Sequence, residues 1–253
     1  MINEAALETV AGALTLEKGE KVLEIGPGLG FLTQKLLERG AEVWAIDKDP
    51  RFIAYLNEKM NVSGVHFVNG DILEFDPQKE IPSAKRLKVI GNIPYNITSL
   101  ILEWLIEKRQ VVGEVVLTVQ AEVAERLSAK PGTKAWGCLS LFLQVYADVE
   151  ILKRFPADIF YPPPNVTSAV IKLHFHSAPR YAISDPEMFF FVVRKAFQKR
   201  RKTLLNALKD DEGFLTKDKV QHALIASSID PMRRPETLAI DEWISLLASI
   251  KQT

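Results

Sequence analysis

The chain of 253 residues contains a single cysteine, Cys138. One thiol cannot form an internal disulfide, and it excludes a zinc cluster built from cysteines. The four histidines show no metal-ligand spacing that carboxylates support; they are His66, His174, His176 and His222. We therefore expect a reducing environment and chemistry without a metal ion, and we interpret Cys138 as a small buried hydrophobic residue.

Long apolar segments are also missing. No run of uncharged apolar residues approaches the roughly 18 to 20 that span a bilayer. The first residues do not combine a basic segment with an apolar one, as a secretory signal does. These absences favour a cytoplasmic protein that does not contact a membrane.

Net charge is absent as well, because 32 basic and 32 acidic residues cancel. This balance argues against a general attraction to nucleic acid. Seven cationic residues nevertheless occur from Arg194 to Lys209 without an acidic one: Arg194, Lys195, Lys199, Arg200, Arg201, Lys202 and Lys209. Such a basic stripe predicts one face that binds an anionic polymer, and a solvated helix face is the ordinary alternative.

The first two-thirds of the chain alternate short apolar runs with helical patterns, which is typical of an α/β sheet built from βαβ units. The runs predict strands at Lys21–Ile25, Glu42–Ile46, Val65–Val68, Leu87–Gly91 and Glu114–Val119. Helices are expected at Phe31–Glu38, Pro50–Lys59 and Ile97–Lys108. Two longer runs, Asp148–Phe155 and Val166–Phe175, flank a proline-rich loop. They predict an antiparallel hairpin that closes a mostly parallel sheet.

After about Ser177 the pattern becomes helical. Helices are expected at Pro186–Lys199, Thr203–Leu208, Lys217–Ala226 and Asp241–Ile250. The sequence therefore predicts two domains: an α/β domain at 1–177 and a small all-helical domain at 178–253.

A glycine-rich turn, Glu24-Ile25-Gly26-Pro27-Gly28-Leu29-Gly30, joins the first strand to the first helix. Its glycines allow a sharp turn and a close approach by a ligand. Asp47 ends the next strand, where a carboxylate can bind ribose hydroxyls, and Asp71 follows the third, where it can accept a hydrogen bond from an adenine amine. All three features lie at the carboxyl edge of one sheet. They fit either NAD or S-adenosylmethionine, and a helix-starting acid and an ordinary turn are the structural alternatives.

The segment Asn92-Ile93-Pro94-Tyr95 follows the fourth strand. The exocyclic amine of adenine is a poor nucleophile because its lone pair is delocalised into the ring. The Asn92 oxygen and a nearby backbone carbonyl can hold both amine hydrogens and favour a pyramidal nitrogen. Pro94 preorganises these acceptors, and Tyr95 offers a stacking face. The segment predicts adenine-amine methylation, with an ordinary Asn-Pro turn as the alternative.

Four motifs together resemble the KsgA/Dim family of ribosomal RNA adenine dimethyltransferases, close to the bacterial small-subunit type. They are the glycine-rich turn with the residues up to Thr33, Asn92–Ile97, Phe160–Val170 and Arg234-Pro235-Glu236-Thr237-Leu238. The resemblance implies an α/β, Rossmann-like class I S-adenosylmethionine-dependent methyltransferase fold with a C-terminal helical domain. It also implies dimethylation of two adjacent adenosines in the 3′-terminal hairpin of 16S rRNA, in the small subunit or its precursor, with S-adenosylhomocysteine as the other product. We expect a monomer, although the sequence does not reveal the oligomeric state.

The resemblance also implies roles for individual residues. The cofactor would be bound by Glu24, Gly26, Gly28, Asp47, Asp71 and Asn92. The reaction centre would consist of Asn92, Pro94, Tyr95 and Phe160, with Tyr95 and Phe160 flanking the target base; a packed hairpin corner is the alternative for Phe160. RNA phosphates would be contacted by Arg194, Lys195, Lys199, Arg200, Arg201 and Lys202.

Two related activities compete with this interpretation: a resistance methyltransferase acting on large-subunit rRNA, and a non-catalytic ribosome-assembly factor. The triple-proline loop and the Arg-Pro-Glu-Thr-Leu ending favour the small-subunit enzyme, and the intact Asn92 and Tyr95 favour catalysis. The family also carries a Gly-Gln-Asn/His-Phe-Leu motif before its first helix, and this chain begins at Met1-Ile2-Asn3-Glu4 where that motif should just have ended. We therefore expect weak cofactor binding and low activity from the chain as given.

Overall fold

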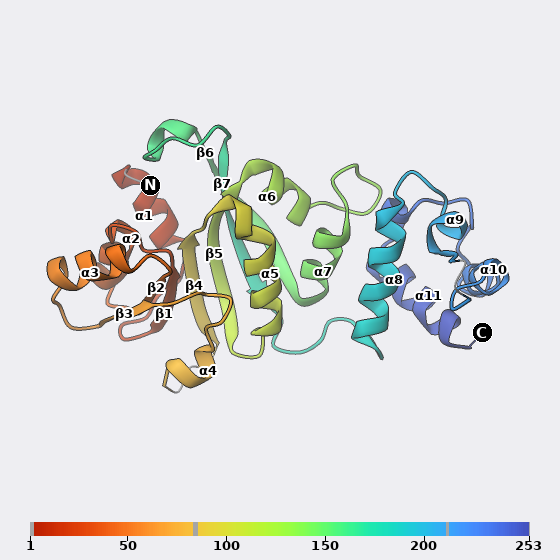
Figure 1. Ribbon diagram of the computed structural model, residues 1–253, viewed down its shortest axis with the longest axis horizontal. Coiled ribbons are helices and arrows are strands. Elements are labelled where there is room, and N and C mark those ends of the chain that lie inside the picture. The colour runs from red at the N-terminus through yellow and green to blue at the C-terminus, as the bar shows by residue number, and fades with distance from the viewer. Residues whose placement is uncertain (1–2, 83–85, 211–212, 253) are drawn as a thin grey trace. The chain divides into compact units, whose positions relative to one another are not determined.

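The computed structural model describes residues 3–82, 86–210 and 213–252. The chain forms two compact units. One consists of Met1–Glu125 and Tyr146–Ser177, and the other of Arg126–Val145 and Ala178–Thr253. Figure 1 shows a sheet surrounded by helices in the first unit and helices in the second.

The first unit contains a seven-stranded sheet with the strand order β3-β2-β1-β4-β5-β7-β6. The strands are β1 (Lys21–Ile25), β2 (Glu42–Asp47), β3 (Val65–Asn69), β4 (Leu87–Asn92), β5 (Val112–Gln120), β6 (Ala147–Phe155) and β7 (Ser168–Phe175). Strands β1 to β5 pair in parallel, whereas β7 runs antiparallel to both β5 and β6. The predicted hairpin at the end of a mostly parallel sheet is thus confirmed.

The direction in which strands are added to the sheet changes at β1. Chain order places β2 and β3 on one side of β1 and β4 on the other. Ile25, the last residue of β1, pairs with Ile46 of β2 and Gly91 of β4, so the carboxyl ends of the three strands lie together. Ligands of such sheets bind in the crevice outside these ends, at the point where the order reverses.

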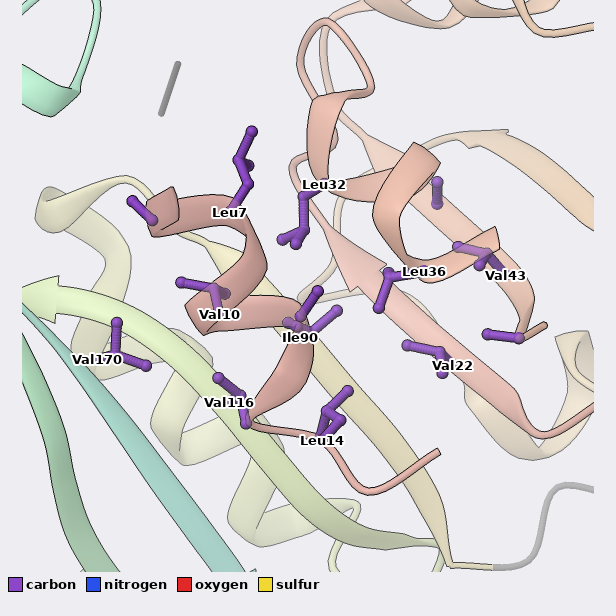
Figure 2. Packing of buried hydrophobic residues seen from close by; sticks show 14 of the residues in the cluster. Leu7, Val10, Leu14, Val22, Leu32, Leu36, Val43, Ile90, Val116 and Val170 are labelled. Atoms are coloured by element: carbon purple, nitrogen blue, oxygen red, sulfur yellow. The ribbon is translucent and has the colours of Figure 1, made fainter. Parts of the chain in front are cut away.

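The central strands are apolar because helices cover them. Figure 2 shows Leu7 and Val10 of α1 (Glu4–Gly12), and Leu14 just after it, in one cluster with Leu36 of α2 (Phe31–Glu38) and the strand residue Val22. All of these side chains are almost fully buried. The strands of a sheet buried on both faces have nearly continuous apolar sequences, and for this reason they could be predicted.

The predicted helices α2, α3 (Pro50–Lys59) and α5 (Thr98–Glu107) are present. Four other helices were not predicted from the sequence: α1, α4 (Pro77–Glu80), α6 (Ala121–Leu127) and α7 (Cys138–Tyr146). Helix α1 has a sequence signal, since Asn3 accepts a hydrogen bond from Ala6 N at 3.0 Å as an N-cap. Helix α7 is a short, mostly apolar segment, and periodicity alone does not distinguish such a segment from a buried strand. Short 3₁₀ turns occur at η1 (Tyr95–Ile97), η2 (Ala157–Ile159) and η3 (Pro235–Thr237).

The second unit contains α8 (Pro186–Gln198), α9 (Leu204–Leu208), α10 (Lys217–Ala226) and α11 (Ile240–Gln252). The sequence-based division placed residues 126–145 in the first domain, but the structure groups them with these helices. The Trp136 indole, fully buried, donates to Leu238 O at 3.1 Å. The Arg200 guanidinium donates to the carbonyls of Lys134 and Trp136 at 3.0 and 2.9 Å. These long-range bonds hold the segment in the second unit.

Among the described residues, no helix is both long enough and apolar enough to cross a bilayer.

Candidate active site

The glycine-rich turn leads from β1 into α2. Gly26, Gly28 and Gly30 have φ values of 69°, 55° and 82°, a region that favours glycine. A Cβ on Gly30 would lie 2.6 Å from Leu56 Cδ2, so this glycine allows α2 to pack closely on α3. A Cβ on Gly28 would meet no other protein atom within 4 Å. The open side of Gly28 is therefore space that a ligand can enter.

Asp47 ends β2 and connects the glycine turn to α3. Its Oδ2 accepts a hydrogen bond from Gly28 N at 3.4 Å, and its Oδ1 accepts one from Asp49 N at 2.9 Å. Asp49, not Asp47, is the N-cap of α3. Asp47 is therefore not merely the acid that starts the helix, because it also accepts a hydrogen bond from the glycine turn.

Asp71 follows β3 in a tight turn. Its carboxylate accepts hydrogen bonds from Lys48 Nζ at 2.7 Å and from Leu73 N at 3.0 Å. The hydrogen bond from Lys48, and to a lesser extent the one from the Leu73 amide, holds the pKa of Asp71 below its usual value. Asp71 is therefore an ionised acceptor at the carboxyl edge of the sheet.

Glu24 lies within β1 and is only 1% exposed. Burial raises the pKa of Glu24; the neighbouring Thr33 hydroxyl opposes this and the nearby Asp47 carboxylate adds to it, so that the pKa is about 7. Its Oε2 finds no hydrogen-bond partner in the described part of the chain. A buried carboxyl with an unpaired oxygen is costly unless a ligand supplies a partner.

A cavity of about 960 Å³ collects these groups. All six residues predicted to bind the cofactor line it: Glu24, Gly26, Gly28, Asp47, Asp71 and Asn92. The wall also includes residues that the sequence analysis did not select, among them Leu7, Val10, Lys48 and Tyr161. Leu7 and Val10 come from α1, whose apolar spacing was the available signal. The volume suits a nucleoside-sized ligand.

A second cavity of about 220 Å³ lies beside the Asn92-Ile93-Pro94-Tyr95 segment. The four residues predicted for the reaction centre line it together: Asn92, Pro94, Tyr95 and Phe160. Asn92, Pro94, Tyr161 and Pro162 border both cavities. Ligands in the two cavities would therefore meet at Asn92.

The side chains around the smaller cavity differ in how far other residues already hold them. The Asn92 amide makes no hydrogen bond to any described residue, so it is available to a ligand. Phe160 is 7% exposed and packs into the core cluster beside α1, so only part of its ring can face the cavity. The Tyr95 hydroxyl and the Ser168 hydroxyl lie 2.5 Å apart. The sequence analysis missed Ser168, because no local pattern links positions so far apart.

The basic stripe contains two kinds of side chain. Lys195 pairs with Asp210 at 2.9 Å, Arg200 holds the 134–136 backbone, and the Arg194 guanidinium lies 5.1 Å from the centre of the Phe142 ring. A second group has exposed side chains that form no hydrogen bond or ion pair with the described residues: Lys199, Arg201 and Lys202. The second group is free to bind an anionic polymer, whereas the first already has partners within the unit.

Comparisons with known proteins identify relatives of this chain. The chain is 41% identical over 244 residues to the ribosomal RNA small subunit methyltransferase A of Myxococcus xanthus (strain DK1622), covering 96% of this chain and 86% of the relative. It is 37% identical over 247 residues to the protein of the same name from Alkaliphilus oremlandii (strain OhILAs), with the same coverage.

Two solved structures share the fold. A dimethyladenosine transferase from Plasmodium falciparum matches with a TM-score of 0.82 at 24% identity, over 100% of this chain and 97% of its own. The 23S rRNA methyltransferase ErmE matches with a TM-score of 0.74 at 24% identity, over 99% and 98%. Both confirm the Rossmann-like class I methyltransferase fold. Because the family model for ribosomal RNA adenine dimethylase also matches residues 1–252, the chain belongs to the ribosomal RNA adenine dimethylase family.

Proposed function

We propose that this chain methylates the exocyclic amines of two adjacent adenosines in the 3′-terminal hairpin of 16S rRNA, using S-adenosylmethionine. The observation that carries the proposal is the junction of the two cavities at Asn92, where a methyl donor and a base can meet. The names of the curated relatives support the small subunit as the source of the substrate.

The larger cavity fits the cofactor. We assign the ribose hydroxyls to Asp47 and the adenine amine to Asp71, because both residues line this cavity. The open side of Gly28 would let the ligand approach the backbone closely. The unpaired Glu24 oxygen suits the cationic methionine end. When bound, S-adenosylmethionine supplies a methyl group already activated by its sulfonium, and S-adenosylhomocysteine is the product.

The chain's own contribution at the reaction centre is orientation. The Asn92 oxygen and a carbonyl of Ile93 or Pro94 accept the two amine hydrogens, which directs the nitrogen lone pair towards the larger cavity. Tyr95 and Phe160 flank the base in the smaller cavity. After methyl transfer the nitrogen is cationic and acidic, so it can release its proton to water without a strong base. Proximity and orientation then supply most of the acceleration.

RNA binding is assigned to the second unit. Lys199, Arg201 and Lys202 have exposed side chains suited to phosphates. Arg194, Lys195 and Arg200 add positive charge to the same surface while they hold the unit together. A base in a hairpin loop leaves its stack at lower cost than one in a duplex. The chain acts as a monomer, in the cytoplasm, where small subunits are assembled.

Incorporation of label distinguishes the possible substrates. Small and large ribosomal subunits that lack adenine methylation are each incubated with methyl-labelled cofactor and the protein. Label in the small-subunit RNA is the expected result. Label confined to the large subunit would show that the substrate is large-subunit RNA. Label in neither subunit would contradict the proposed activity.

A further inference from the structure

We propose that Ser168 is a positioning residue, whose buried hydroxyl fixes the ring of Tyr95 against the target base. This inference rests on the proposed function, because it concerns the same smaller cavity. It begins from the distance of 2.5 Å between the Tyr95 and Ser168 hydroxyl oxygens.

The sheet holds Ser168 in place from both sides. Ser168 is the first residue of β7, has no exposed surface, and pairs with Gln120 of β5 and Phe155 of β6. Its neighbour Thr167 accepts a hydrogen bond from Ala121 N at 2.9 Å. The Ser168 oxygen is therefore a fixed point in a rigid part of the fold.

Tyr95 has much less support. It is the first residue of η1, a 3₁₀ helix of one turn, and is half-buried. Its bond to Ser168 is the one side-chain hydrogen bond that Tyr95 makes to the described residues. With the Cα fixed at one end and the hydroxyl at the other, the ring keeps one orientation. Without the bond, the ring regains freedom about its side-chain torsions, at a cost to stacking geometry.

The same bond connects the two walls of the smaller cavity. One wall is the Asn92–Tyr95 segment, and the other is formed by Phe160, Tyr161, Pro162 and Pro164. Strand β7 begins shortly after this proline loop, so Ser168 ties Tyr95 to the strand that supports the opposite wall. The bond thereby sets the separation between the faces that hold the base.

A kinetic double-mutant cycle tests the inference with small subunits as substrate. The variants are Ser168→Ala, Tyr95→Phe and the double variant, with Ser168→Thr to restore the hydroxyl. Each single variant should lower kcat about 3- to 10-fold, the size expected for one neutral hydrogen bond. The double variant should lose no more than either single one, and Ser168→Thr should retain most of kcat.

Thr118 provides a matched control. It is also fully buried on β5, but its hydroxyl has no hydrogen-bond partner within the described chain. Thr118→Val should leave kcat unchanged. Cofactor affinity should stay within about 2-fold in Ser168→Ala, because a general loss of structure would lower it as well.

Three results would overturn the inference: wild-type kcat in Ser168→Ala, wild-type kcat in Tyr95→Phe, or additive losses in the double variant. If Ser168→Ala does not fold, the Tyr95→Phe measurement alone still decides. An inactive wild-type chain would contradict the proposed function, whereas an active wild type with an unaffected Ser168→Ala contradicts only this inference.

Discussion

The Lys48 ammonium lies 2.7 Å from Oδ2 of Asp71, joining the carboxyl ends of β2 and β3 at the wall of the larger cavity. Lys48 is mostly exposed, with 81% of its side chain accessible, whereas Asp71 is 23% exposed. The carboxylate that Lys48 occupies is the one assigned to the cofactor's adenine amine. If Asp71 binds the cofactor as proposed, Lys48 competes with it and places a positive charge beside a cationic ligand.

Replacing Lys48 by methionine should strengthen cofactor binding. The substitution frees Asp71 Oδ2 and removes the like charge, so we expect S-adenosylmethionine to bind about 2- to 5-fold more tightly. The gain should be smaller for S-adenosylhomocysteine, which lacks the sulfonium charge. Titration calorimetry on both ligands measures this. Equal or weaker binding by Lys48→Met would show that the ion pair does not compete.

Glu24 should make cofactor binding depend on pH. Its pKa of about 7 means that the carboxyl is mostly neutral at pH 6 and mostly ionised at pH 8. A cationic ligand favours the ionised form, so affinity should increase from pH 6 to pH 8. Glu24→Gln should bind more weakly at pH 8 and show a flat profile. A wild-type affinity that does not change over this range would contradict the role of Glu24.

Glu24 should also make stability depend on pH, in the opposite direction. The folded pKa of about 7 exceeds the ordinary value of 4.5, so the folded chain retains a proton that the unfolded chain releases. Its contribution to unfolding free energy therefore falls as pH rises from 4.5 through 7, by up to about 3 kcal/mol. Urea unfolding of wild type and Glu24→Gln at pH 5 and pH 8 tests this. Relative to wild type, the free energy of unfolding of Glu24→Gln should be higher at pH 8 than at pH 5.

Two glycines of the turn should respond differently to alanine. Gly30→Ala places a Cβ 2.6 Å from Leu56 Cδ2 and 2.8 Å from Met60 Sδ, so it should lower the unfolding free energy by about 2 kcal/mol or more. Gly28→Ala meets no protein atom and should cost about 1 kcal/mol from its positive φ alone. Gly28→Ala should instead weaken cofactor binding more than 10-fold. Similar cofactor affinity in Gly28→Ala and wild type would place the ligand elsewhere.

The three exposed cations of the basic stripe should carry the salt dependence of RNA binding. Replacing Lys199, Arg201 and Lys202 by glutamine should weaken binding and reduce the slope of log K against log salt by roughly 2 units. Arg200→Gln is the matched control, since Arg200 holds the carbonyls of Lys134 and Trp136. Arg200→Gln should mainly lower stability. An unchanged slope in the triple variant would show that these residues do not bind the RNA.

The candidate site was largely predictable because its residues follow strand ends. Parallel strands bring their carboxyl ends to one edge, so Gly26, Asp47, Asp71 and Asn92 could be placed together from the sequence alone. The bond between Tyr95 and Ser168 was not predictable, because it joins side chains distant in the sequence. The partners of Lys195 and Arg200 were hidden for the same reason.

The division of the chain shows a similar limit. The change to a helical pattern near Ser177 was visible, but nothing in the composition marks the boundaries of the 126–145 segment. Its place in the second unit depends on Trp136, whose indole reaches the backbone of Leu238. Tertiary contacts of this kind join residues far apart in the chain and therefore leave no local sequence pattern.

Mapping of methylated nucleosides tests the central claim most directly. Small subunits lacking adenine methylation are incubated with labelled cofactor and either wild type or Asn92→Ala, and the modified nucleosides are identified and located. The account predicts N6,N6-dimethyladenosine at two adjacent adenosines of the 3′-terminal hairpin, formed at least about 100-fold more slowly by Asn92→Ala. Methylation at other nucleotides, or equal rates for the two proteins, would contradict it.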